Sequence, residues 1–182
     1  MKRALLLLVP AVGISIVWLD RPLATLVDRA LASPGLFRWA DLFFTLLLVA
    51  GGVLIALSFL PAGRALRRPA LAGVIGLILS EAIKFLAGRS PVYPTFLVEG
   101  VSMLTPFHAG SFPSTTATVS TAVAGVLGTA CRRPRPLYAI VLVVVCAFLV
   151  VVNAHWLSDV LAGILLGGVT ASAILIKPEP PA

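Results

Sequence analysis

Long apolar runs are the feature that most constrains the fold of this chain, because each is near the length that crosses a hydrocarbon core. They cover residues 4–19, 42–61, 70–88, 114–130, 137–153 and 156–176. With 59% hydrophobic and 12% charged residues, a water-soluble fold would leave a large apolar surface exposed. We therefore predict an all-α integral membrane bundle of six transmembrane helices, forming a single domain over residues 1–182.

The segment between the first two runs is amphipathic rather than uniformly apolar. Residues 22–31 place Leu23, Leu26, Val27 and Ala30 at helical spacing, with charged side chains off that face. This pattern predicts a short helix lying on the outer surface of the membrane.

The formal net charge of +7 comes from short basic clusters between the apolar runs, which is typical of membrane topology and argues against nucleic acid binding. If the N-terminus is cytoplasmic, nine of the 14 Lys and Arg residues face the cytoplasm. The inner set is Lys2, Arg3, Arg64, Arg67, Arg68, Arg132, Arg133, Arg135 and Lys177, and the outer set is Arg21, Arg29, Arg38, Lys84 and Arg89. We predict a multi-pass protein of the inner (plasma) membrane with both termini cytoplasmic.

A histidine and an aspartate, His155 and Asp159, stand four residues apart at the start of the last apolar run. This spacing places both side chains on one face of a helix. A carboxylate one turn away can accept the ring N–H of the histidine and leave its other nitrogen free as a nucleophile or base. The alternative is a lone histidine that caps or packs at the membrane interface.

Charged residues also mark the end of the third run, where Glu81 and Lys84 lie three residues apart and Arg89 follows. Charged side chains inside a membrane span are energetically costly unless they form ion pairs or bind a ligand. One interpretation is a Glu81–Lys84 ion pair with Arg89 among the headgroups. The other is that Lys84 and Arg89 converge on an anion such as a phosphate.

The fourth run begins with Ser114, Thr115 and Thr116 after Pro113, which is typical of a helix start. These residues can act simply as caps, but the N–H groups of such a start also form an anion site. The long loop before it, residues 89–112, is a candidate lid and contains His108. We expect the helix ends with Lys84, Arg89, Ser114 and His155 to share the outer, periplasmic face.

At these positions the chain resembles the type 2 phosphatidic acid phosphatase superfamily of membrane lipid phosphatases, whose members share three motifs on six helices. His155 and Asp159 match the third motif, S-R-x5-H-x3-D, and Lys84 matches the first, K-x6-R-P. Ser114 follows Pro113 as in the second motif, P-S-G-H. The departures from the motifs are Thr115 for the glycine, Thr116 for the histidine, Pro91 for the first-motif arginine and Leu149 for the third-motif arginine. The chain thus resembles a divergent member that lacks several usual motif residues.

The resemblance implies that His155 attacks phosphorus to give a phosphohistidine, with Asp159 orienting the ring. Lys84, Arg89, Ser114 and the N–H groups of Thr115 and Thr116 would stabilise the equatorial oxygens. The missing second-motif histidine normally protonates the leaving group, and His108 is a candidate substitute. Without that acid, a lipid diphosphate is the expected substrate rather than a phosphate monoester, because a lipid monophosphate leaves more readily than an alkoxide.

Two hypotheses of different classes remain at this stage. The first is a membrane lipid phosphatase acting on a lipid phosphate or diphosphate, such as a polyprenyl diphosphate, at the outer face. The second is a catalytically silent relative that binds an anionic lipid or a membrane partner. We expect no cofactor and no metal, since Cys131 and Cys146 lack a metal-like spacing.

Overall fold

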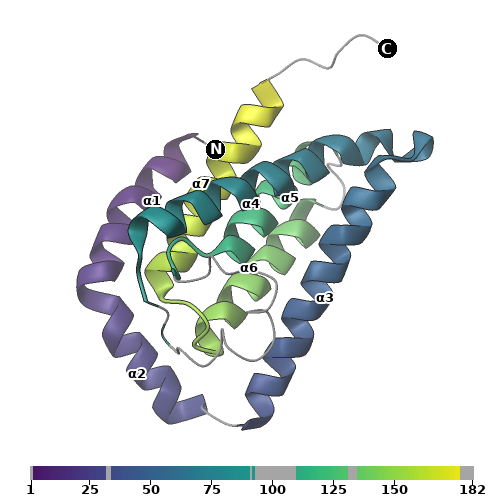
Figure 1. Cartoon of the computed structure of the whole chain (residues 1–182). Helices are drawn as coiled ribbons and strands as arrows, with labels where there is room; N and C mark the ends of the chain where they lie inside the picture. Colours follow the sequence, from purple (N-terminus) through teal and green to yellow (C-terminus); the bar gives the residue numbers. More distant parts are fainter. Residues whose placement is uncertain (1, 32–33, 91, 93–109, 131–134, 177–182) are drawn as a thin grey trace.

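The computed structural model describes residues 2–31, 34–90, 92, 110–130 and 135–176, and these residues form helices joined by short turns, with no strand among them (Figure 1). The elements are α1 (Lys2–Ile14), the π-helical turn η1 (Ser15–Leu19), α2 (Asp20–Leu31), α3 (Pro34–Ser58), the 3₁₀ segment η2 (Pro61–Leu66), α4 (Arg67–Ala87), α5 (Thr115–Ala130), α6 (Arg135–Val151) and α7 (Leu157–Ile176). The prediction of an all-α fold is confirmed for these residues.

The last four predicted runs agree closely with α4 to α7. The ends differ by at most three residues, the largest difference being the start of α4 at Arg67 against the predicted 70. The second run begins earlier than predicted, because α3 starts at Pro34 rather than at residue 42. Proline fits the first turn of a helix, where its missing N–H needs no partner, so α3 extends through the polar residues before the apolar run.

Helix α5 lies at the centre of the bundle and packs most closely against α7 and next against α4, and α4 also contacts α7. Small residues allow this approach. A Cβ added to Gly167 would lie 2.3 Å from the carbonyl oxygen of Thr118, and one added to Gly163 would lie 2.7 Å from that of Ser114. Close backbone contact through glycine is a common way for helices to associate inside a membrane, where the hydrophobic effect does not drive helices together.

Two apolar clusters hold the bundle together. One joins α4, α5 and α7 through Ala72, Ala122, Val126, Ala171 and Ile174. The other joins α5, α6 and α7 around the fully buried Leu149, and side chains of α3 pack against it. Phe43 of α3 reaches this second cluster, with its ring centroid 4.5 Å from that of Phe148.

The N-terminal helices form one bent arm along the bundle, the purple segment in Figure 1. Leu5 in α1 lies against Gly168 of α7, whereas Ser15 and Asp20 lie beside Ser158 at the start of α7, so α1 and α7 run antiparallel. The short helix predicted over residues 22–31 is present as α2, which starts at Asp20 and follows η1 without a break in helical backbone. Its place on the outer membrane surface stays a prediction.

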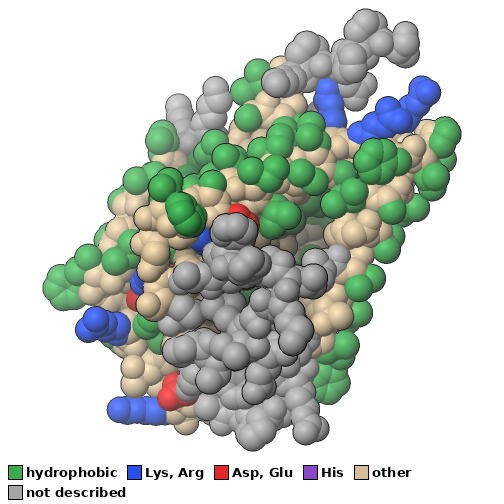
Figure 2. Space-filling model, viewed as in Figure 1, with side chains coloured by type: hydrophobic (Ala, Val, Ile, Leu, Met, Phe, Trp, Pro, Cys, Tyr) green, Lys and Arg blue, Asp and Glu red, His purple; other side chains and the backbone are tan. Residues whose placement is uncertain are grey.

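Among the described residues, three helical stretches are long and apolar enough to cross a membrane: Leu5–Ala30, Pro61–Ala87 and Leu157–Ile176. Leu42–Ser58 and Pro136–Val151 are apolar but shorter. Figure 2 shows hydrophobic side chains over the helices of one face, with Lys and Arg near its upper and lower ends. Large apolar side chains are exposed, such as Phe85 at 74% and Leu86 at 82%, which suits a membrane rather than water. The protein is thus a helical membrane protein, and the count of six spans, their orientation and the single-domain assignment stay predictions.

The close packing of α5 on α7 makes Gly167 a sensitive position. Gly167→Ala should lower the free energy of unfolding by about 1–3 kcal/mol, because the new methyl group meets backbone atoms that cannot move aside. Gly52→Ala in α3 is the matched control, since a Cβ there meets no described atom within 4 Å. Alanine also favours helix over glycine by about 1 kcal/mol, so this control should be neutral or stabilised. Thermal unfolding in detergent measures both, and equal stability of the two variants would contradict the packing.

Candidate active site

The turn between α6 and α7 places His155. Asn153 has a left-handed backbone (φ 55°) that ends α6, a conformation that asparagine tolerates better than most residues. The carbonyl oxygen of Leu149 then accepts the N–H of His155 at 3.3 Å. The Asn153 side-chain amide donates to the carbonyl of Ala24 at 3.0 Å, which ties this turn to α2.

Asp159 lies in the first turn of α7 and is fully buried. Its Oδ2 accepts the backbone N–H of Trp156 at 3.2 Å and lies 3.6 Å from Nδ1 of His155. The second distance is too long for a hydrogen bond. Within the described residues, the buried Nδ1 of His155 makes no hydrogen bond. The predicted pair is therefore adjacent, but Asp159 does not hold the ring in this arrangement.

Arg89 reaches Asp159 from the end of α4. Gly88 adopts a left-handed conformation (φ 57°) that ends the helix and turns the chain, so that Arg89 points across the bundle. Its Nη1 lies 2.7 Å from Oδ1 of Asp159, and its Nη2 lies 2.6 Å from Oδ2 of Asp20. The guanidinium carbon also lies 5.3 Å from the centre of the Trp156 ring, within the range of a cation–π contact.

Sequence reasoning missed Asp20 and Ser158. Asp20 is 2% exposed and accepts hydrogen bonds from both the N–H and the hydroxyl of Ser158. In the sequence, Asp20 directly follows an apolar run, where an acid reads as the water-facing end of a span. In the sequence, Asp20 is recognisable only as an acid between an apolar segment and an amphipathic one. Such acids are too common for this position to mark Asp20 as a site residue.

Lys84 belongs to a second polar cluster. Its Nζ lies 3.1 Å from Oε1 of Glu81, which confirms that the ion pair weighed from their spacing is present. The same oxygen accepts the hydroxyl of Thr115 at 2.6 Å, and Ser80 lies 3.3 Å from that hydroxyl. Lys84 and Arg89 thus engage different carboxylates here, and their convergence on one anion stays a prediction.

Ser114 joins the two clusters. Its N–H donates to the carbonyl oxygen of Asp159 at 3.0 Å, which fixes the start of α5 against the start of α7. Its hydroxyl accepts the N–H of Ala117 at 3.4 Å, the hydrogen bond of an N-cap. Thr115 and Thr116 form the half-buried first turn of α5, whose N–H groups point out of the helix end.

The two ends of the predicted lid loop are clasped together beside the site. The N–H of Ser111 donates to the carbonyl oxygen of Arg89 at 2.7 Å. The carbonyl oxygen of Ser90 accepts both the Ser111 hydroxyl and the Trp156 indole N–H, each at 3.1 Å. The middle of this loop, including the candidate acid His108, lies outside the described residues.

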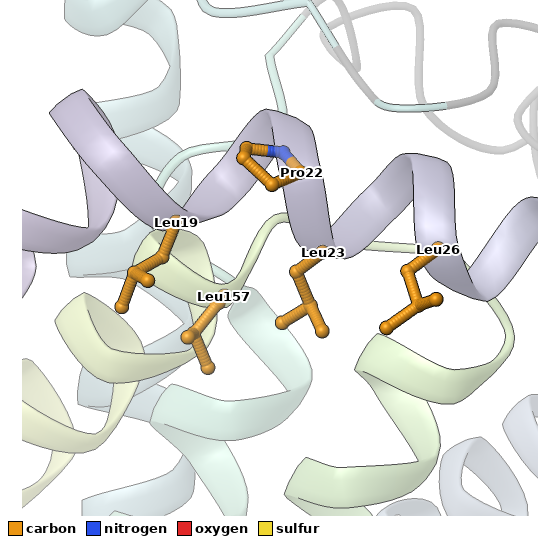
Figure 3. Close-up of a pocket in the computed structure, with 5 residues that line it drawn as sticks. All are labelled: Leu19, Pro22, Leu23, Leu26 and Leu157. Carbon is orange, nitrogen blue, oxygen red and sulfur yellow. The ribbon is translucent and has the colours of Figure 1, made fainter.

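An apolar groove of about 370 Å³ lies between the arm and the start of α7 (Figure 3). The leucines of the arm and Leu157 point in the same direction in Figure 3. The lining of the groove is Leu19, Pro22, Leu23, Leu26 and Leu157. Since Leu157 directly precedes Ser158, the groove opens next to the polar cluster.

The described site contains more acid than base. Its cations are Lys84 and Arg89, and its carboxylates are Glu81, Asp20 and Asp159, which sum to a formal charge of −1 before His155 is counted. Both cations are already paired. In the part of the chain that the structure describes, no group of three or more His, Cys, Asp or Glu side chains is placed to hold a metal ion.

Comparison with known proteins gives one match. A family model described as the PAP2 superfamily matches residues 65–179, and the resemblance inferred from the motifs is confirmed. No curated protein and no solved structure matches the chain. The matched region contains Lys84, Arg89, Ser114, His155 and Asp159, whereas Asp20 lies outside it.

The double pairing of Arg89 predicts unequal effects of removing the two cations. Arg89→Met leaves two buried carboxylates without a counter-charge and should lower the free energy of unfolding by about 3–5 kcal/mol. Lys84→Met is the control and should cost less, because the side chain of Glu81 is 26% exposed and keeps its bond to Thr115. Urea or thermal unfolding of the two variants checks this. An Arg89→Met protein as stable as the Lys84→Met protein would contradict the buried network.

Proposed function

Because the chain belongs to the PAP2 superfamily, whose members generally hydrolyse phosphate esters, we propose that it is a membrane lipid phosphatase. The observation that carries this proposal is the meeting of three helix ends. Arg89 after α4, Ser114 before α5, and His155 with Asp159 at α7 all come from separate segments of the matched region. We further propose that the substrate is a lipid phosphate or diphosphate bound from the outer membrane face.

In the proposed reaction, Nε2 of His155 attacks phosphorus and forms an N–P bond while the P–O bond to the leaving group breaks. Water then attacks the same phosphorus, which breaks the N–P bond and releases inorganic phosphate. Asp159 faces Nδ1, so it is placed to accept the ring N–H and stabilise positive charge on the ring. The 3.6 Å separation must shorten for this role, and catalytic hydrogen bonds are often long before substrate binds.

Phosphate binding requires the site to open its own ion pairs. Nη1 of Arg89 and Nζ of Lys84 would exchange a carboxylate oxygen for a phosphate oxygen. The hydroxyl of Ser114 and the N–H groups of Thr115 and Thr116 would add donors at the start of α5. Moving Arg89 away from Asp159 would also free that carboxylate for His155, so substrate binding and activation of the nucleophile would be coupled.

The leaving group decides the substrate class. Thr116 stands where the family has its acid histidine, and a hydroxyl does not donate a proton readily at neutral pH. A lipid monophosphate leaves without full protonation, because the second pKa of such a phosphate is about 6. We therefore propose a lipid diphosphate, such as a polyprenyl diphosphate, as the preferred substrate. His108 stays a proposed proton donor for monoesters.

The apolar groove between the arm and α7 is the proposed place for the first part of the lipid tail. Leu157 of its lining stands between His155 and Ser158 in the chain, so a lipid whose phosphate binds at His155 could extend its tail into the groove. The loop of residues 89–112 is the other proposed wall, although most of it lies outside the described residues.

A second candidate function is that of a catalytically silent relative that binds an anionic lipid or a membrane partner. The charge balance of the site favours this alternative, because both described cations are paired with carboxylates. Such a protein would bind lipid phosphate weakly and release no phosphate.

Phosphate release from lipid mono- and diphosphates by purified protein distinguishes the two functions. The wild type should act on diphosphates in preference to phosphatidic acid, and His155→Ala should abolish both activities. The double change Thr115→Gly with Thr116→His should raise monophosphate turnover selectively, by about 10²–10⁴ if it restores a general acid. Preference of the wild type for monophosphates would disprove the leaving-group argument. No release from any substrate would leave the silent relative as the function.

The groove predicts a dependence on chain length. Leu23→Trp should fill it and raise KM for a long-chain diphosphate about tenfold, the effect of losing contacts for roughly two methylene groups. A short-chain diphosphate should be affected little. Leu6→Trp, at a side chain of α1 that is 70% exposed, is the control for added bulk in the arm. Equal effects on both chain lengths would exclude the groove as the tail site.

A further inference from the structure

Asp20 is the buried acid of the site that the family motifs do not supply. It starts α2, outside the matched residues 65–179, and its exposed fraction is 2%. Burying a carboxylate is costly unless it is paired and hydrogen-bonded. Neighbouring donors and cations must therefore stabilise the charge of Asp20, and these neighbours indicate what the residue does.

Asp20 accepts four hydrogen bonds, two on each oxygen. Oδ1 accepts the Ser15 hydroxyl at 2.9 Å and the Ser158 N–H at 3.0 Å. Oδ2 accepts Nη2 of Arg89 at 2.6 Å and the hydroxyl of Ser158. The carboxylate is thus held by its own helical arm, by α7 and by Arg89.

Asp159 holds the same guanidinium less completely. Its Oδ1 accepts Nη1 of Arg89, and among the described residues its Oδ2 accepts only the N–H of Trp156. Of the two carboxylates on Arg89, Asp20 is therefore the fixed one. When a phosphate oxygen replaces Asp159 on Nη1, Nη2 can stay on Asp20.

We propose that Asp20 is a positioning residue that anchors Arg89 by Nη2 and aims Nη1 at the phosphate on His155. This inference rests on the proposed function. A long arginine side chain carries about 2 kcal/mol of rotamer entropy, so fixing it in advance strengthens each bond that it makes to a phosphate. Asp20 also holds the first turn of α7 through Ser158, which sets the direction of Asp159.

A purely structural role for Asp20, as a tie between the arm and α7, is the competing explanation. Ser15→Ala is the matched control for that role, because it removes one hydrogen bond of Asp20 and leaves Arg89 untouched. Asp20→Asn keeps the size of the side chain and removes the charge that anchors Arg89. If Asp20 anchors Arg89, Asp20→Asn should change the surroundings and the function of Arg89, and Ser15→Ala should not.

Trp156 provides a readout that does not depend on turnover, because Arg89 lies over its ring. The chain has three tryptophans, so Trp18→Phe with Trp39→Phe leaves Trp156 as the sole emitter. In this full-length background, Asp20→Asn should shift Trp156 emission and raise its quenching by acrylamide.

Asp20→Asn should also raise KM for a lipid diphosphate at least tenfold and lower kcat/KM by about 10²–10³, a loss typical of one misplaced charge-stabilising donor. Ser15→Ala should change neither emission nor KM.

The proposal is overturned if Asp20→Asn and Ser15→Ala give the same emission and the same kcat/KM. If the wild type releases no phosphate, the proposed function fails, and orthovanadate binding read by Trp156 emission decides instead. At least tenfold weaker binding in Asp20→Asn than in Ser15→Ala supports the anchor. Equal binding, or none to the wild type, overturns it.

Should Asp20→Asn not fold, Asp20→Glu keeps the charge and moves the carboxylate by one methylene. A lower kcat/KM with a native melting temperature then supports the anchor, and an unchanged kcat/KM overturns it.

Discussion

The guanidinium of Arg89 between the carboxylates of Asp20 and Asp159 is the interaction on which the site depends. Both acids are essentially buried, at 2% and 0% side-chain exposure, and burying them without a counter-charge would be costly. One side chain thereby joins the N-terminal arm, the end of α4 and the start of α7. The arm is fixed to the remainder of the bundle at the same point where the candidate nucleophile lies.

Backbone contacts make this junction rigid. The N–H of Ser114 binds the carbonyl oxygen of Asp159, and Gly163 one turn further along α7 lies against the carbonyl of Ser114. A larger residue at Gly163 would separate α5 from α7 and with them the two helix starts. The small residue at Gly163 therefore helps to set the geometry of the site, because it lets the starts of α5 and α7 lie close together.

The site is assembled although several motif residues of the family are missing. The family's additional arginine positions hold Pro91 and Leu149, and Leu149 is fully buried in an apolar cluster beneath the His155 turn. Its carbonyl oxygen still positions the N–H of His155. The fold thus keeps the location of the histidine by backbone hydrogen bonds, while the cations that remain are balanced by carboxylates from α2, α4 and α7.

The sequence by itself determined the membrane class, the bounds of α4 to α7, the family and the proximity of His155 to Asp159, because apolar periodicity and one-turn spacing are local properties of a helix. Only the tertiary structure decided which charges pair. Arg89 meets Asp20 and Asp159 across 69 and 70 residues of chain, and Ser158 meets Asp20 across 138. No local pattern encodes such distances, so Asp20 read as an interfacial acid and Arg89 as a free cation. The same limit explains why the sequence did not show that α2 follows η1 without a break: Asp20 at this junction is satisfied by Ser158 of α7, a partner that lies near it only after the chain has folded.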